Sequence, residues 1–446
     1  MCVSRMFRAL SAACVAAAIL VHPSFAWSQS ATAGSNPSGE QGPQTSPPVV
    51  SAEQPSPPPE NAVPRRGMTA TWQDGLSIET SDGDYQVRIG ALVRLDGRFA
   101  MNAAPGAPAN TFTMRTVRAN IQGRITRYFT YRLVPDFLST TSLVADAYVD
   151  IGLSSAMHLR IGRDKTPTGF EALLGDANVL FMERGLTLNL MPGRDVGVQV
   201  YGDAPGGVVS YAGSIFNGTA DGTTAGNLDT DNGKELVGRT VVRPFTRAGP
   251  SALHKLGVAL AGTWEHQHGA LPSFRTSVQQ PYFAYAAGAT ADGLHTRISP
   301  QIFHYYKSFS LYTEYARSRQ AVRKAAAGAV VTNRVWQVAG SFLLTGETAG
   351  ERVHPKRTFD PENHTWGALQ VMARYGSMTL DPTIFALGLA DGGSSRQVQV
   401  ATVGAIWFLT TNVKSLLDVE RTAFDRNQPG ARDTEHSILF RLQLNF

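Results

Sequence analysis

Cysteine is almost absent from this sequence. The 446 residues contain two cysteines, Cys2 and Cys14, and both lie close to the N-terminus. The rest of the chain can therefore form no disulfide framework, no cysteine-based zinc site and no catalytic thiol. An excess of one charge sign is missing as well, because 40 Lys+Arg against 35 Asp+Glu leaves a formal net charge of +5. That is too small an imbalance to indicate nucleic-acid binding.

Long apolar runs and catalytic motifs are also missing. Between about residue 85 and residue 446 no run approaches the roughly 20 apolar residues of a transmembrane helix, which excludes a helical membrane bundle. The sequence has no G-x-S-x-G elbow, no H-E-x-x-H pair and no phosphate-binding loop. We therefore predict no enzyme, no catalytic residues, no metal ligands and no cofactor. A barrel enzyme with Ser, His and acidic side chains at its rim is the competing interpretation.

The N-terminal region predicts export. Arg5 and Arg8 precede an apolar stretch at 10–21, and the sequence SFA at 24–26 is typical of a cleavage site. Residues 1–26 are therefore predicted to be a signal peptide. Residues 27–72 are rich in Pro, Ser and Gln, so they bury too little apolar surface to fold, and a disordered linker is predicted there. The remaining domain is then 73–446.

Residues of this domain alternate in polarity with a period of two. Near the C-terminus Ile438, Phe440 and Leu442 share one parity, whereas Ser437 and Arg441 share the other. A strand with one apolar and one polar face suits a sheet whose apolar side meets lipid or a core. We find about sixteen such segments of roughly the 9–11 residues or slightly more that a tilted membrane strand needs. They lie near 85–97, 111–124, 127–137, 143–152, 156–164, 194–203, 207–216, 235–245, 254–264, 295–305, 308–318, 332–344, 365–377, 396–408, 411–423 and 435–446.

Connections between these segments mostly alternate in length. The turns at 126–127, 204–207, 306–307 and 410–411 are short. The connections 98–110, 165–193, 217–234, 265–294, 319–331, 378–395 and 424–434 are long, and 345–364 is long where a short turn is expected. Short turns at one end and long loops at the other are typical of an outer-membrane barrel. A soluble sandwich or propeller is the alternative. Aromatic residues near strand ends and export without disulfides favour an all-β, antiparallel transmembrane barrel.

Arginine recurs on the parity that would face the interior of the barrel. A guanidinium stays ionised and binds oxyanions in a bidentate manner, so a series of them indicates an anion path. For any single arginine, an ion pair with a carboxylate that braces the barrel wall is an equally good explanation. The connection 165–193 is placed to fold inward and narrow the bore, with Lys165 at its start and Arg194 at its end. The candidate pathway residues are Arg88, Arg94, Arg115, Arg118, Lys165, Arg194, Arg239, Arg243 and Arg297.

Several segments together resemble the phosphate-selective porin O and P family of Gram-negative outer membranes. They are FTMRTVR at 112–118, GRDKTPTGFE at 162–171, RDVGVQ at 194–199, FNG at 216–218, Gly238-Arg239 with Pro244, FLLTGE at 342–347, WGA at 366–368 and LQLNF at 442–446. The resemblance implies a sixteen-stranded barrel, usually trimeric, with an arginine ladder that leads to a lysine-bearing constriction. It makes Arg115 and Arg118 ladder members and Lys165 the loop lysine.

The spacing of Arg115 and Arg118 departs from this pattern. Residues three apart lie on opposite faces of a regular strand, so either Arg115 lies at the channel mouth or the strand bulges there. Thr116 and Val117 also stand where family members often carry adjacent arginines.

We expect an outer-membrane porin for passive diffusion of small anions, with phosphate or related oxyanions favoured. The expected partners are these anions, outer-membrane lipid and two further copies of the chain in a homotrimer. The alternatives are a general or organic-anion porin without phosphate specificity and a non-conducting structural or adhesive barrel.

Overall fold

The computed structural model describes residues 66–446 apart from 73, 103–108, 141, 227–228, 230 and 426–431. The predicted signal peptide and most of the predicted linker 27–72 lie outside the described residues. In the described part of the chain, no helix is both long enough and apolar enough to cross a membrane.

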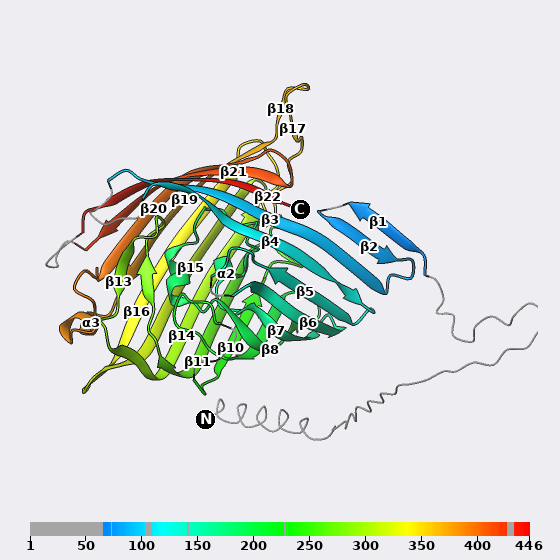
Figure 1. The fold of residues 1–446 in the computed structure, drawn as a ribbon. Coiled ribbons are helices and arrows are strands. Elements are labelled where there is room, and N and C mark those ends of the chain that lie inside the picture. Colours follow the sequence, from blue (N-terminus) through cyan, green and yellow to red (C-terminus); the bar gives the residue numbers. More distant parts are fainter. Residues whose placement is uncertain are drawn as a thin grey trace, which may run out of the picture. The chain divides into compact units, whose positions relative to one another are not determined.

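The fold is a closed antiparallel β-barrel of 16 strands (Figure 1). Each strand pairs with its neighbours in the sequence, and the last strand, β22, pairs with β3 to close the sheet. All the predicted strand segments correspond to barrel strands. These strands are β3 Tyr85–Ala100, β4 Thr111–Ile125, β5 Phe129–Pro135, β6 Val144–Ser154, β7 Met157–Lys165, β8 Arg194–Asp203, β9 Val209–Phe216, β10 Glu235–Val242, β11 Gly257–Gly269, β14 Ala289–Tyr306, β15 Phe309–Lys324, β16 Ala327–Leu343, β19 Ala368–Thr379, β20 Gln397–Phe408, β21 Val413–Phe424 and β22 Glu435–Asn445.

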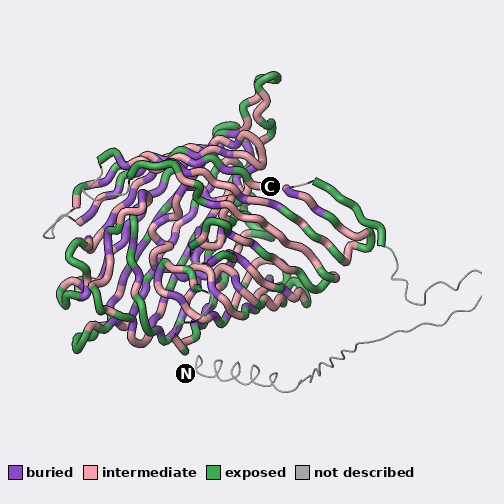
Figure 2. Tube along the Cα trace, viewed as in Figure 1, coloured by how far each residue is buried: buried purple, intermediate pink, exposed green. Residues whose placement is uncertain are grey.

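Burial alternates along the strands, as Figure 2 shows by the change of colour from residue to residue. In β21 the side chains of Leu417 and Val419 are exposed, whereas those of Asp418 and Glu420, which alternate with them, are buried. This is the reverse of a soluble protein, in which charged side chains face outward. The apolar parity therefore forms the lipid-facing surface, and the polar parity faces the interior of the barrel.

The seam between the first and last barrel strands carries a buried ion pair. Arg441 lies directly opposite Asp96 in the register of β22 with β3. Its Nε donates to Asp96 Oδ1 at 2.7 Å and its Nη2 donates to Oδ2 at 2.7 Å. Both side chains are almost fully buried, at 1% and 0% exposure. A bidentate pair of this kind fixes register as well as adding attraction.

The two ends of the barrel differ in their connections. One end has the short turns after β4, β6, β8, β14 and β20, and it also holds the C-terminal residue Phe446; by its turn lengths it is the periplasmic end. The expectation of a long loop at 319–331 is wrong, because β15 and β16 continue to a turn at 325–326. The alanine, glycine and valine residues of this segment fit the paired strands, so β15 and β16 stay hydrogen-bonded up to the turn. The expected exception is present: residues 344–367 form a long periplasmic connection, which includes β17 Phe359–Asp360 and β18 Thr365–Trp366.

An N-terminal hairpin extends the sheet beyond the barrel. Strand β1, Met68–Trp72, pairs with β2, Leu76–Thr80, and β2 pairs with the first residues of β3. Strand β1 thus occupies the last residues of the predicted linker. All five of its residues are exposed, so it has no buried face that apolar alternation could have revealed. The ring of Trp72 stacks on that of Phe446 at 5.6 Å.

Shorter elements lie in the long connections. Residues 166–193 contain helix α2, Phe170–Leu173, and the 3-10 helix η1, Leu186–Leu190. Residues 270–288 contain the hairpin β12 Ser273–Arg275 and β13 Pro281–Ala284, residues 380–396 contain α3 Pro382–Ala386, and residues 243–256 contain η2 Ser251–Leu253. Phe283 of β13 is buried in one apolar cluster with Leu190 and Ile384, so these three connections pack together.

Candidate functional site

A single carboxylate in the 166–193 connection gathers four cationic side chains. Asp176 pairs with Lys165 at 3.2 Å, Arg184 at 2.6 Å and Arg194 at 2.9 Å, and it also pairs with Arg118. Lys165 and Arg194 lie opposite each other at the facing ends of β7 and β8. The strand register therefore brings two cations to the base of the connection. Together these five residues are called the Asp176 cluster below.

Backbone geometry before Lys165 depends on a glycine. Gly162 has a φ of +132°, and a Cβ there would lie 2.2 Å from the carbonyl oxygen of Ala147. A side chain is therefore excluded at this position of β7, three residues before Lys165. The Lys165 ammonium also donates to the Leu174 carbonyl at 2.6 Å, which ties the strand end to the residue that follows α2.

Arg184 forms hydrogen bonds within the 166–193 connection. It donates to the carbonyl oxygens of Glu171 and Ala172, each at 2.7 Å, and to that of Leu174 at 3.0 Å. These are carbonyl groups that a short helix leaves without partners in its own backbone. Arg184 therefore shapes the 166–193 connection and at the same time contributes charge to the Asp176 cluster.

The surroundings of Asp176 favour its charged form. Burial by itself would raise the pKa of this carboxyl, but the adjacent Lys165, Arg194, Arg184 and Arg118 lower that pKa well below its usual value. Asp176 is therefore ionised at any ordinary pH. Arg118 also pairs with Asp136 at 2.7 Å, and Arg194 also pairs with Asp146 at 2.6 Å. Four cations therefore face three carboxylates, and the site keeps an excess of one positive charge.

A second carboxylate of the connection, Glu183, faces β3 and β4. Burial by itself would raise the pKa of Glu183. The neighbouring Arg115 and Arg98 lower it by more, so the pKa lies below its usual value. Arg115 is 3.8 Å away and about half exposed, at 47%. The register of β3 with β4 shifts between Arg94 and Leu95, so that Arg94 pairs with Thr116 and Leu95 with Met114. Arg115 is the extra residue, and of the two alternatives for its spacing the bulge is the observed one.

Residues 166–193 contact strands from across the barrel. The Phe170 amide donates to Glu314 of β15 at 2.5 Å, and the Met182 amide donates to Asp418 of β21 at 2.7 Å. Gln443 of β22 donates to the Ala177 carbonyl at 2.9 Å. Each of these strand residues belongs to the buried polar parity. The connection is thereby bonded to side chains that face the interior.

Two cavities share the Asp176 cluster. One, of about 310 Å³, lies toward the N-terminal hairpin and the C-terminus, since Asp74 and Phe446 line it. The other, of about 430 Å³, lies toward the long loops, since Ser139 and Thr140 line it. Arg118, Asp176 and Arg194 line both cavities. Each is bordered by six cationic and three acidic side chains. We call them the periplasmic cavity and the outer cavity.

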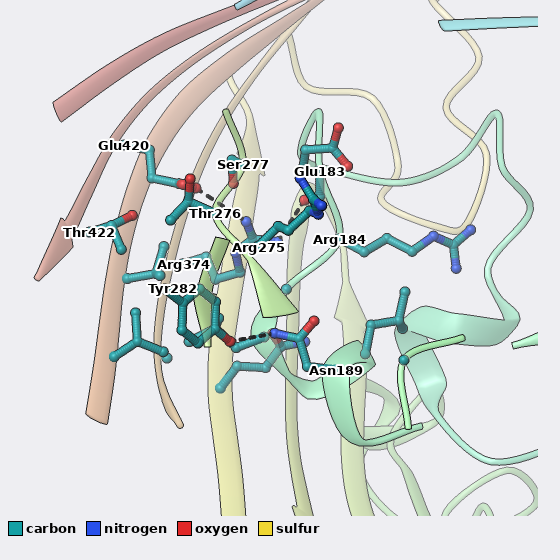
Figure 3. Close-up of a pocket in the computed structure, with 18 of the residues that line it drawn as sticks. Glu183, Arg184, Asn189, Arg275, Thr276, Ser277, Tyr282, Arg374, Glu420 and Thr422 are labelled. Atoms are coloured by element: carbon teal, nitrogen blue, oxygen red, sulfur yellow. Dashed lines mark hydrogen bonds and ion pairs between the residues drawn. The ribbon is translucent and has the colours of Figure 1, made fainter. Parts of the chain in front are cut away.

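A third cavity, of about 260 Å³, lies between η1, the β12–β13 hairpin and β19–β21 (Figure 3). Arg184, Arg275 and Arg374 line it together with Glu183 and Glu420. Arg374 donates to the Glu183 carbonyl at 2.9 Å, and Asn189 donates to the Tyr282 hydroxyl at 2.8 Å. This cavity therefore adjoins the Asp176 cluster through Arg184, on the side of the long loops.

The predicted pathway residues separate into two groups. Arg88, Arg94, Arg115, Arg118, Lys165 and Arg194 line the periplasmic or the outer cavity. Arg239, Arg243 and Arg297 lie elsewhere. Arg239 donates to Gln301 at 3.0 Å and Arg243 to Ser210 at 2.8 Å. Arg297 is buried among three carboxylates, those of Asp221, Glu235 and Glu265.

Sequence reasoning did not select several members of the site. Asp176, Glu183 and Arg184 lie in the 166–193 connection, which has no periodicity that could assign a direction to their side chains. Arg98 extends the inward parity of β3 beyond the predicted strand end and pairs with Glu183. Among the described residues, no group of three or more His, Cys, Asp or Glu side chains is arranged to hold a metal ion.

Comparison with known proteins identifies the family. The family model for phosphate-selective porin O and P matches residues 93–446. The chain belongs to this family. As a porin of this family it is an outer-membrane channel rather than an enzyme. No curated protein sequence matches it.

Solved porin structures share the fold at low identity. OmpT of Vibrio cholerae, in a trimer form, has a TM-score of 0.52 at 10% identity over 81% of this chain and 99% of its own. The outer membrane channel DcaP of Acinetobacter baumannii has a TM-score of 0.52 at 11% identity over 82% and 99%. An anion-selective porin from Comamonas acidovorans has a TM-score of 0.50 at 11% identity over 81% and 100%. At these identities the likeness concerns the fold alone.

Proposed function

We propose that this porin passes small anions by diffusion across the outer membrane and favours phosphate or related oxyanions. The observation that carries the proposal is the Asp176 cluster, in which four cations converge on one carboxylate between two cavities and outnumber that carboxylate together with their other partners, Asp136 and Asp146. The residues proposed to line the path are Arg88, Arg94, Arg115, Arg118, Lys165 and Arg194.

The path follows the order of the cavities. An anion from outside meets Arg115 and Arg94 in the outer cavity, passes the Asp176 cluster, and reaches Arg88 in the periplasmic cavity. Guanidinium groups replace part of the hydration shell that the ion loses in a narrow passage. Because each arginine of the cluster is already paired with a carboxylate, its hold on a passing ion is moderate, and the ion can leave again.

We also infer that residues 166–193 constrict the channel. A bore of sixteen strands is otherwise wide and filled with water. The hydrogen bonds from this connection to Glu314, Asp418 and Gln443 support an inward position. A homotrimer, cleavage of residues 1–26 and a disordered linker after them complete the proposal. The trimer form of the Vibrio cholerae porin of similar fold supports the first of these.

The third cavity favours a second candidate, a channel for organic anions. Arg184, Arg275 and Arg374 offer three cationic groups around a space of about 260 Å³. That space exceeds the needs of a phosphate ion, so a larger anion could occupy it before the narrow passage. In this alternative the channel is anion-selective without phosphate specificity.

Planar-bilayer recording of the purified protein separates these functions. The proposal expects a reversal potential that favours chloride over potassium in a KCl gradient, and a chloride current that phosphate blocks. Anion preference without phosphate block supports the organic-anion candidate. Folded protein without any conductance supports a structural or adhesive barrel, and preference for potassium contradicts both channel proposals.

A further inference from the structure

The periplasmic cavity ends at an ion pair between two segments that lie outside the Asp176 cluster. Arg352 of the 344–367 connection donates from Nη1 to Asp74 Oδ2 at 2.8 Å and from Nη2 to Asp74 Oδ1 at 2.7 Å. Both residues line the periplasmic cavity. The remaining lining residues include the candidate path residues Arg88, Arg118, Lys165 and Arg194.

Both partners are held in place by the fold. Asp74 lies in the β1–β2 turn with a φ of 55°, and Gly75 follows with a φ of +111°. A Cβ at Gly75 would lie 2.4 Å from the Ile89 carbonyl oxygen, so the turn fits closely against β3. Arg352 lies three residues after Ala349, whose amide donates to the Lys307 carbonyl at 2.6 Å. It directly precedes Val353, which is buried in the main apolar cluster.

A carboxylate that accepts both arms of a guanidinium occupies the position that an oxyanion would take. Phosphate and carboxylate present the same pair of oxygens to the arginine fork. The Arg352 and Asp74 side chains are 30% and 34% exposed, and an ion pair this accessible is weak and open to exchange with dissolved ions.

Arg88 supplies a second group for such an ion. Its Nε is buried and makes no hydrogen bond within the described part of the chain. The described residues give Arg88 no carboxylate partner, so the charge of its guanidinium stays available to an anion in the cavity. The cavity thus combines an arginine that has no carboxylate partner with an arginine whose fork is filled by an exchangeable carboxylate.

We propose that Arg352 is the exit station of the path and that Asp74 is its built-in competitor for small oxyanions. An ion that leaves the Asp176 cluster displaces Asp74 from Arg352 with the help of Arg88. The return of Asp74 to Arg352 then releases the ion into the periplasm. No covalent step is involved. This inference rests on the proposed anion path and specifies where and how the ion leaves it.

Phosphate block of the chloride current tests the exchange. Asp74→Asn removes the competitor, and we expect the half-blocking phosphate concentration to fall by about threefold to tenfold. Arg352→Gln should raise that concentration, and in the double variant Asp74→Asn should have no further effect. The matched control is Asp292→Asn, which removes the carboxylate from an Arg323–Asp292 pair of 2.7 Å near the long loops.

The outcomes separate the two proposals. The exchange site is refuted if Asp74→Asn lowers the half-blocking phosphate concentration no more than Asp292→Asn does. It is also refuted if Asp74→Asn lowers that concentration equally in the wild type and in the Arg352→Gln variant. In either case Asp74 contributes only to the local field. If wild-type channels are not blocked by phosphate, the phosphate path itself fails and the exit station fails with it. A heat-modifiable band in gel electrophoresis establishes for each variant that the barrel is folded.

Discussion

Replacing Lys165 by Gln tests the charge of the Asp176 cluster directly. The substitution removes one positive charge but keeps a long polar side chain. Asp176 keeps Arg118, Arg184 and Arg194 as partners, so the 166–193 connection should stay in place. We expect a less anion-selective channel with weaker phosphate block.

The size of the effect follows from the cavity. A space of about 310 Å³ places an ion at its centre roughly 6 Å from the charges that line it. At that distance one unit charge contributes about 0.7 kcal/mol in a water-like medium and about 2.8 kcal/mol at an effective dielectric constant of about 20. In a cavity filled with water the lower figure is the better guide, and it corresponds to about threefold in affinity for a monovalent ion. For a divalent phosphate the free-energy change doubles, so its affinity should fall by about tenfold.

The assay therefore compares the effect of the substitution on phosphate block with its effect on chloride conductance. We would measure the half-blocking phosphate concentration and the chloride conductance of Lys165→Gln and wild type in the same bilayers. The control is Lys234→Gln, because Lys234 pairs with Asp229 and donates to the Gly233 carbonyl in a surface loop. If phosphate block and chloride conductance change by the same factor, or if both variants behave alike, Lys165 does not act on the passing ion by charge.

Two further predictions concern the C-terminus and the pH response. Deleting Phe446 should lower the amount of folded barrel in the outer membrane several-fold. The reason is that the Phe446 backbone exchanges two hydrogen bonds with Ala91 and its ring stacks on Trp72. Unchanged amounts of heat-modifiable protein would contradict this prediction. Asp176→Asn should shift the reversal potential toward stronger anion preference. Because the lowered pKa keeps Asp176 charged even at a pH where an ordinary carboxyl is half protonated, the full difference from wild type should persist from pH 7 down to about pH 4 and fade only at lower pH. Loss of about half of that difference by about pH 4 would show that Asp176 titrates normally.

The barrel could be predicted from sequence because its surface is simple. Lipid demands an apolar side chain at every second position, and this demand leaves a regular trace such as Leu417 and Val419 against Asp418 and Glu420. Strand β1 left no such trace because neither of its faces is buried. The turn at 325–326 was missed because Ala and Gly near it look like loop residues, although they also suit a hairpin.

The site was only partly accessible to the same reasoning. Inward parity placed Arg88, Arg94 and Arg118 on the correct face, whereas the spacing of Arg115 left both a bulge and a position at the channel mouth open. Parity alone does not distinguish a cation beside a cavity from one that braces the wall. Arg297 has the same inward direction, yet it is enclosed by carboxylates that come from other strands and a distant loop. The position of Asp176 depends on the tertiary path of residues 166–193.

The seam between β3 and β22 has a consequence for the order of assembly. Asp96 and Arg441 are 345 positions apart in the chain, so their pairing cannot form until nearly all of the polypeptide is present. Until then β3 and the most recently placed strand both present open edges, and such edges invite pairing with other chains. Contacts between remote residues also form slowly. A nascent porin of this design therefore needs shielding in the periplasm until its final eleven-residue strand arrives.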